Sequence, residues 1–357
     1  MSVVRKLLYW YRKFQYTLFA RSEEGLISDY SKCSIIGDIP SVNKDCVHPC
    51  VRYSATPFRG HHWWMVYTPY YNANAMGENP ILCYGEGNGE PPTEWHVYKE
   101  LIPQPETGYN SDPNMLFHDG NMYIFWRENE TPRLLKNGLH RGTYCIMLTD
   151  TDIETNEVPL LPESLPFEDH EVSPVFMNYK GQIVAFANHL LFKSPGLQKL
   201  NGRVKTIIDK LLLLSDLLGF YSQQKSYGIA LWNGAKFSEP FKYIKSVYPK
   251  HCNHLYRPWH SDAFEYEDHL YMIMQSNQCN ADICIARWNE YLSELVMAKK
   301  PLITNASIGK VGIYKPTAVV YGDNLYVYVS AQDERNRASN ILFRGIIKIT
   351  EVNELFS

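Results

Sequence analysis

The chain has 357 residues, of which 45% are hydrophobic and 14% aromatic, and its formal net charge is −3. A charge this close to neutral argues against partners that are recognised through bulk electrostatics, such as nucleic acid or an anionic membrane. Eight cysteines in a chain of this length are too sparse for a disulfide scaffold.

The N-terminal residues 3 to 20 have the pattern of a short basic, aromatic helix. Two uses stay open: the helix packs on the outside of the main domain, or it makes a peripheral membrane contact with Trp10 and Tyr11 at headgroup level. Basic residues interrupt every apolar run, so a signal peptide and a transmembrane segment are not expected, and we predict a cytoplasmic location. Residues 1–45 are interpreted as this helix and a polar connector with a strand near 33–36.

A β-hairpin unit starts at residue 46 and recurs four more times along the chain. Each copy opens with polar residues, reaches a turn such as Asp119-Gly120, and continues in a branched or aromatic strand such as Met122 to Trp126. In the second copy, Pro113 favours an extended conformation for Asp112. The five openings are His48-Pro49, Asp112-Pro113, Glu171 to Pro174, Trp259 to Asp262, and Lys315-Pro316.

Repeated hairpins at intervals of roughly 55 to 90 residues are typical of propeller blades, with a β-sandwich as the alternative. We therefore predict an all-β fold, a five-bladed β-propeller over residues 46–357. The blades are expected at about 46–105, 109–165, 170–245, 256–302 and 312–352. The last blade is expected to end in two strands, at 341–343 and 346–349.

A helical insertion is predicted in blade III at residues 190–226, where Val204, Leu211 and Leu218 fall on one helical face. We expect it to stand at the rim beside Glu171 as a wall or lid. Association with another chain or with lipid is the alternative, and the oligomeric state is left open.

First strands line the channel of a propeller, so their starts meet at one mouth, where β architectures commonly hold ligands. The predicted catalytic residues there are His48, Asp112, Glu171 and Asp262. The predicted substrate-binding residues are Tyr67, Tyr70, Glu78, Asn79, Trp126, Arg127, Glu128, Trp259, His260 and Lys315. The tyrosines and tryptophans among them offer flat faces to sugar rings.

The motifs His48-Pro49, Asn110 to Pro113 and Trp259 to Asp262 resemble those of five-bladed glycoside hydrolases, namely family 43 arabinanases and xylosidases and the invertase-type enzymes. The resemblance implies an Asp base in blade I, a tuning Asp in blade II and a Glu acid in blade III. Asp112 and Glu171 match the last two positions, whereas His48 stands at the first. A histidine accepts a proton from water but does not replace a carboxylate nucleophile, so inversion is favoured, with Asp262 or Glu78 as substitute carboxylates.

The predicted function is therefore that of a glycoside hydrolase-like protein acting on a bacterial glycan by acid/base chemistry. The alternative is a non-catalytic glycan-binding propeller for surface-polysaccharide assembly, which the histidine at the base position favours. Cys46, His48 and Cys50 alternate along one strand, and residues 251–254 form a second His/Cys group, but neither has a clear fourth ligand. We predict no metal and no cofactor.

Overall fold

The computed structural model describes residues 25–37, 45–70, 74–87, 89–129, 133–135, 138–140, 143–150, 158–160, 171–190, 226–250, 258–276, 282–310, 312–332 and 340–356. The predicted N-terminal helix and the helix predicted within the blade III insertion lie outside these residues.

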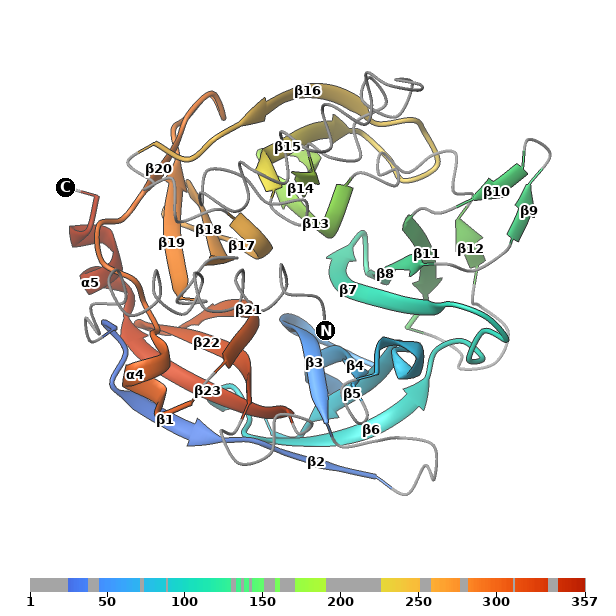
Figure 1. Cartoon of the computed structure of the whole chain (residues 1–357), viewed down its shortest axis with the longest axis horizontal. Helices are drawn as coiled ribbons and strands as arrows, with labels where there is room; N and C mark the ends of the chain where they lie inside the picture. Colours follow the sequence, from blue (N-terminus) through green and yellow to red (C-terminus); the bar gives the residue numbers. More distant parts are fainter. Residues whose placement is uncertain are drawn as a thin grey trace, which may run out of the picture.

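The described strands form five large sheets around a central axis, which confirms the predicted all-β, five-bladed propeller (Figure 1). Blade I contains β3 (Cys46–Phe58), β4 (His61–Pro69), β5 (Ile81–Gly85) and β6 (Glu94–Glu100), with β2 (Ser34–Ile36) outside them. Blade II contains β7 (Tyr109–His118), β8 (Asn121–Asn129), β11 (Thr143–Leu148) and β12 (Val158–Leu160). Blade III contains β13 (Glu171–Tyr179), β14 (Gln182–Leu190), β15 (Ser226–Gly234) and β16 (Lys242–Val247).

Blade IV contains β17 (Pro258–Tyr266), β18 (His269–Ser276), β19 (Ile283–Trp288) and β20 (Leu295–Met297). Blade V contains β21 (Gly312–Tyr321), β22 (Asn324–Gln332), β23 (Asn340–Lys348) and β1 (Asp29–Lys32). The smaller elements are η2 (Ala75–Gly77), the β9 (Arg133–Leu135) and β10 (Gly138–His140) pair, α4 (Asn305–Ile308) and α5 (Ile349–Glu354). In the part of the chain described here, no helix has the length and apolar character needed to cross a membrane.

The first strand of each blade, β3, β7, β13, β17 or β21, is the innermost strand of its sheet and faces the axis (Figure 1). Neighbouring inner strands contact one another around the channel. The sheets pack face to face, and five hydrophobic clusters each lie between two neighbouring blades. Because both faces of a second strand are covered in this way, Trp63 to Tyr67 are all fully buried.

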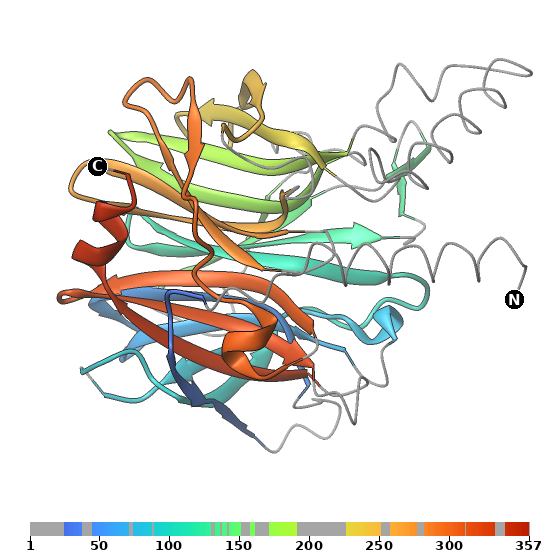
Figure 2. The same cartoon turned by 60° about the vertical axis from the view of Figure 1, so that its left-hand side comes forward.

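The ring is closed by the N-terminal strand β1, which pairs antiparallel with β23 so that Asp29 lies opposite Ile346. The prediction of two strands at the end of blade V is wrong. Residues 340–348 form one strand, and helix α5 begins at Ile349. Gly345 does not interrupt β23 but lets β1 and the residues before it approach, since a Cβ there would lie 3.1 Å from the Tyr30 ring and 2.7 Å from Ile27 Cγ2. Figure 2 shows β1 at the outer edge of blade V.

The hairpin turns form where the sequence predicts them. Arg59-Gly60, Asp119-Gly120 and Lys180-Gly181 all have positive φ at both residues, as the mirror-image turns of tight hairpins require. Blade IV achieves the same turn without glycine, with φ of 48° at Glu267 and 62° at Asp268.

Candidate active site

Each first strand carries a bulge near its start that turns one polar side chain inward. The register shifts at 47/50, 111/114, 172/175, 258/261 and 314/316. His48, Asp112, Ser173 and Lys315 have φ of 53°, 54°, 55° and 22°, and a proline follows each of them. The prediction of an extended conformation for Asp112 is therefore wrong. The bulge sets the left-handed conformation of the residue before the proline, and proline is tolerated there because it lacks an N–H for the ladder.

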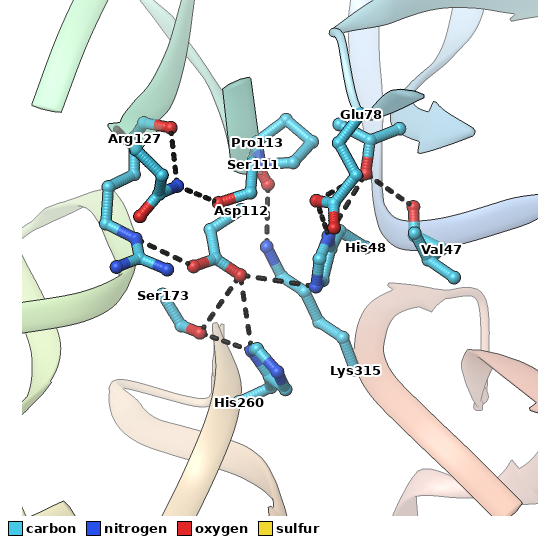
Figure 3. Close-up of polar contacts among 12 residues, drawn as sticks. Val47, His48, Glu78, Ser111, Asp112, Pro113, Arg127, Ser173, His260 and Lys315 are labelled. Carbon is cyan, nitrogen blue, oxygen red and sulfur yellow. Dashed lines mark hydrogen bonds and ion pairs between the residues drawn. The ribbon is translucent and has the colours of Figure 1, made fainter. Parts of the chain in front are cut away.

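The side chains at these positions meet on the channel axis, and Asp112 lies at their centre (Figure 3). Its Oδ1 is 3.4 Å from His48 Nε2, 3.3 Å from His260 Nδ1, and accepts a hydrogen bond from Ser173 Oγ at 3.4 Å. Its Oδ2 accepts a hydrogen bond from Arg127 Nε at 3.1 Å. Burial opposes ionisation of Asp112, but His48, Arg127 and His260 together hold its pKa well below the usual range. The centre of the cluster is thus a buried carboxylate.

His48 is oriented from behind by Glu78. The Nδ1 atom of His48 lies 3.1 Å from Glu78 Oε2 and 3.0 Å from Thr68 Oγ1, and all three residues are buried. A carboxylate only accepts hydrogen bonds, so Nδ1 of His48 carries a proton toward Glu78. The Nε2 atom faces Asp112 Oδ1 at 3.4 Å and has no hydrogen-bond partner among the described residues.

His260 completes the cluster from blade IV. Its Nδ1 shares a 2.5 Å hydrogen bond with Ser173 Oγ, while its buried Nε2 has no hydrogen-bond partner in the described part of the chain. Burial lowers the pKa of His260 to about 3, although Asp112 opposes this shift. The ring is therefore neutral near pH 7, and its contact with Asp112 is not an ion pair.

Lys315 is a fully buried lysine from blade V. Its Nζ donates a hydrogen bond to the carbonyl oxygen of Pro113 at 2.8 Å. Burial lowers the pKa of Lys315, while the carboxylate of Asp112 opposes the shift. Lys315 and Arg127 are the basic side chains beside Asp112.

Aromatic residues surround the cluster. The ring of Tyr314 lies 5.1 Å from that of His48 and 4.5 Å from that of His260. Trp259, which is partly exposed, lies 5.3 Å from His260 and hydrogen-bonds Tyr314. Tyr70 is also partly exposed, and burial together with the charge of Glu78 raises its pKa. Tyr70 and Trp259 are thus the predicted aromatic residues that remain available to a ligand.

Asp262 does not join the Asp112 cluster. It follows His260 by two residues, about 6.6 Å further along an extended strand. Arg52 binds its two oxygens at 2.6 and 2.8 Å, and Thr317 Oγ1 donates to it at 2.6 Å. Burial opposes ionisation, yet Arg52 keeps the pKa of Asp262 low. Its carboxylate joins blade IV to blades I and V through these hydrogen bonds, so the structure does not support a catalytic role.

Other predicted site residues are also placed elsewhere. Tyr67 and Trp126 pack in the hydrophobic cores between blades, with exposed fractions of 0% and 5%, so neither offers a face to a sugar. Asn79 donates to Glu100 and Ile102 and accepts from Asn110, which ties blade I to blade II. Glu128 is buried at the end of β8, opposite Asn110.

Glu171 begins β13, opposite His189 and two residues before Ser173. Its backbone therefore lies at the same end of the channel as the cluster, and its side chain lies outside the described residues. The structure adds Ser173, Thr68 and Tyr314, which the sequence analysis did not single out. The signal for Ser173 was present, since it precedes a proline in the same way as His48, Asp112 and Lys315.

His48, Asp112 and His260 also offer ligand atoms that all lie within 4.8 Å of one another. The cluster thus combines an oriented imidazole, a carboxylate and a second neutral imidazole. Such groups can accept a proton from a water molecule or ligate a cation.

The fold resembles that of solved structures of enzymes named for carbohydrate substrates. A β-xylosidase, RS223, aligns with 85% of this chain and 92% of its own, at 11% identity and a TM-score of 0.60. Levansucrase of Bacillus subtilis, solved with oligosaccharides, aligns over 95% and 92%, at 11% identity and a TM-score of 0.59.

An N-acetylgalactosamine deacetylase from F. plautii, solved with blood group B trisaccharide, aligns over 91% of this chain and 94% of its own. Its sequence identity is 13% and its TM-score is 0.58. No protein-family model and no curated protein matches the sequence. At these identities the structural likeness establishes the fold.

Proposed function

We propose that this protein is a carbohydrate-active hydrolase that cleaves a glycosidic bond of a bacterial glycan at the mouth of its channel. The observation that carries the proposal is the chain of contacts from Glu78 through His48 to Asp112. Glu78 orients the imidazole, and Nε2 of the imidazole faces the buried carboxylate of Asp112. The enzymes that share this fold act on glycans by their descriptions, which supports the substrate class.

In the proposed reaction the His48–Asp112–His260 cluster activates a water molecule. The water oxygen bonds to the anomeric carbon, its proton passes to the cluster, and the glycosidic C–O bond breaks. The leaving oxygen takes a proton from an acid, for which we propose Glu171 because β13 starts at this end of the channel. Four polar groups already surround Asp112, and His48 is not a carboxylate nucleophile, so the proposed outcome is inversion.

The test is a screen of the purified chain on aryl glycosides and bacterial polysaccharides, with binding and product release recorded separately. Asp112→Asn should lower kcat by about 10²- to 10⁴-fold, the usual contribution of acid/base groups, in a variant that is still folded. Asp119→Asn, at the exposed hairpin turn, is the matched control and should retain full activity. Binding without release by the wild type would instead support the glycan-binding alternative.

A further inference from the structure

We infer that His48, Asp112 and His260 form a binding site for one divalent transition-metal ion, for which Zn²⁺ is the probe. The inference deepens the proposed function, on which only the role of the ion in hydrolysis rests. It departs from the expectation of no metal. That expectation considered neighbours along the chain, whereas these ligands come from blades I, II and IV.

Two of the three separations between the ligand atoms match those in a tetrahedral metal site. Bonds of 2.0–2.1 Å in a tetrahedral site place neighbouring ligand atoms about 3.3–3.4 Å apart. Asp112 Oδ1 lies 3.4 Å from His48 Nε2 and 3.3 Å from His260 Nδ1, and all three ligand atoms lie within 4.8 Å of one another. Two imidazoles and one carboxylate are a common ligand set for catalytic zinc, which keeps a further position for water.

The unpaired nitrogen of His48 points to the same conclusion. His48 Nε2 is buried and has no hydrogen-bond partner among the described residues. His48 Nε2 faces Asp112 Oδ1 at 3.4 Å, a separation that one metal ion bonded to both atoms would span. A bound metal ion would satisfy the nitrogen and the carboxylate together.

The surrounding groups support ligation by His48 and leave one oxygen of Asp112 for the ion. Metal-bound histidines usually donate their other N–H to a carboxylate, and Glu78 occupies that position at 3.1 Å. Arg127 binds Asp112 Oδ2 and leaves Oδ1 toward the histidines. The charges of Arg127 and Lys315 oppose a cation, while those of Asp112 and Glu78 favour it.

The inference is tested by metal binding without any glycan. The full chain is stripped with a chelator, dialysed, and titrated with Zn²⁺ by calorimetry, with bound metal measured by elemental analysis. We expect one equivalent per chain and a higher melting temperature. Co²⁺ in place of Zn²⁺ should give the visible absorption of a site with nitrogen and oxygen ligands.

Variants then assign the ligands. His260→Gln should abolish stoichiometric binding, and Glu78→Gln, which keeps the shape of the side chain, should weaken it about 10- to 100-fold. His118→Ala is the matched control, because His118 Nε2 lies 3.4 Å from Asp119 Oδ2 at an exposed turn. It should bind Zn²⁺ as the wild type does.

Well under one equivalent of Zn²⁺ and no Co²⁺ spectrum in the wild type would overturn the inference. Equal binding by the wild type and a folded His260→Gln variant would overturn it as well. Glycan turnover is measured separately on the stripped and the loaded protein. Stoichiometric metal without turnover contradicts the proposed function alone, and turnover without metal binding contradicts the metal site alone.

Discussion

Two buried aspartates in the channel have different surroundings. Asp262 is hydrogen-bonded by Arg52, Thr317 and a backbone N–H, whereas Asp112 faces His48 Nε2, which lacks a hydrogen bond among the described residues. Burial alone therefore does not distinguish a structural carboxylate from a functional one. The distinction lies in whether the partners are satisfied.

Arg52→Met should destabilise the fold by about 3–5 kcal/mol, because it leaves the Asp262 carboxylate buried without its cation. Urea unfolding measures the change. Lys250→Met is the control: Lys250 pairs with Glu294 at 2.6 Å, but both side chains are about half exposed, so the loss should stay below about 1 kcal/mol.

The double variant Arg52→Met/Asp262→Leu provides a second check. Removing both charges avoids the unpaired carboxylate, so the double variant should be more stable than Arg52→Met alone. If Arg52→Met unfolds at the same urea concentration as the wild type, the pair does not hold the blades together.

At the scale of the element, the hairpin turns differ in one testable respect. Blade III has Gly181 at the second turn position, with φ of 74°, whereas blade IV has Asp268 there, with φ of 62°. A side chain in the left-handed region costs about 1–2 kcal/mol relative to glycine. Asp268→Gly should therefore raise the melting temperature, since the backbone oxygen of Asp268 keeps its bond from Tyr179.

Gly181→Ala is the reciprocal change and should destabilise by about 1 kcal/mol through the backbone alone. A Cβ at Gly181 would meet no atom within 4 Å, so packing does not contribute. Thermal unfolding of both variants with the wild type checks the pair. Opposite signs are expected, and a loss of stability in both would contradict the role of the turn.

The elements with strong local patterns were predictable from the sequence. Alternating strands and turn residues located the hairpins, and a strand was predicted near 33–36, where β2 (Ser34–Ile36) forms. Strand β1 was not, because Asp29 to Lys32 is short and polar and is fixed only by its distant partner β23. Local patterns identify a strand, but they do not identify its neighbour in the sheet.

The site was predicted in part for a similar reason. His48, Asp112, His260, Arg127, Lys315 and Glu78 were expected together and lie together. Asp262 was misplaced because a two-residue step in β17 moves it to a different level of the channel. Tyr67 and Trp126 were misplaced because an aromatic residue near a strand end can also face the core between blades.

At the scale of the whole molecule, the contact between β1 and blade V should be sensitive to volume. Gly345→Ala puts a Cβ 2.7 Å from Ile27 Cγ2 and 3.1 Å from the Tyr30 ring. Overpacking of this kind usually costs about 1–3 kcal/mol. Gly89→Ala is the control, because a Cβ there would meet nothing within 4 Å. Equal unfolding midpoints for the two variants would contradict tight closure at Gly345.

The buried cysteines can report whether the ring opens as one unit. Burial raises the pKa of Cys33 to about 12 and that of Cys50 to about 11, so neither is a reactive thiolate near pH 7. Cys145 and Cys284 are also buried, in blades II and IV. With a thiol reagent in rising urea, peptide mass spectrometry should find these thiols modified together. Early modification of one blade would indicate separate opening.

The pairing of β1 with β23 also constrains the order of events during synthesis. Residues 29–32 leave the ribosome first, while β23 follows about 300 residues later, on the order of tens of seconds at usual translation rates. Throughout that interval the growing propeller has an open side, and β1 has no partner in blade V. Closure is therefore a late step of folding, and the edge of blade V that pairs with β1 is completed last.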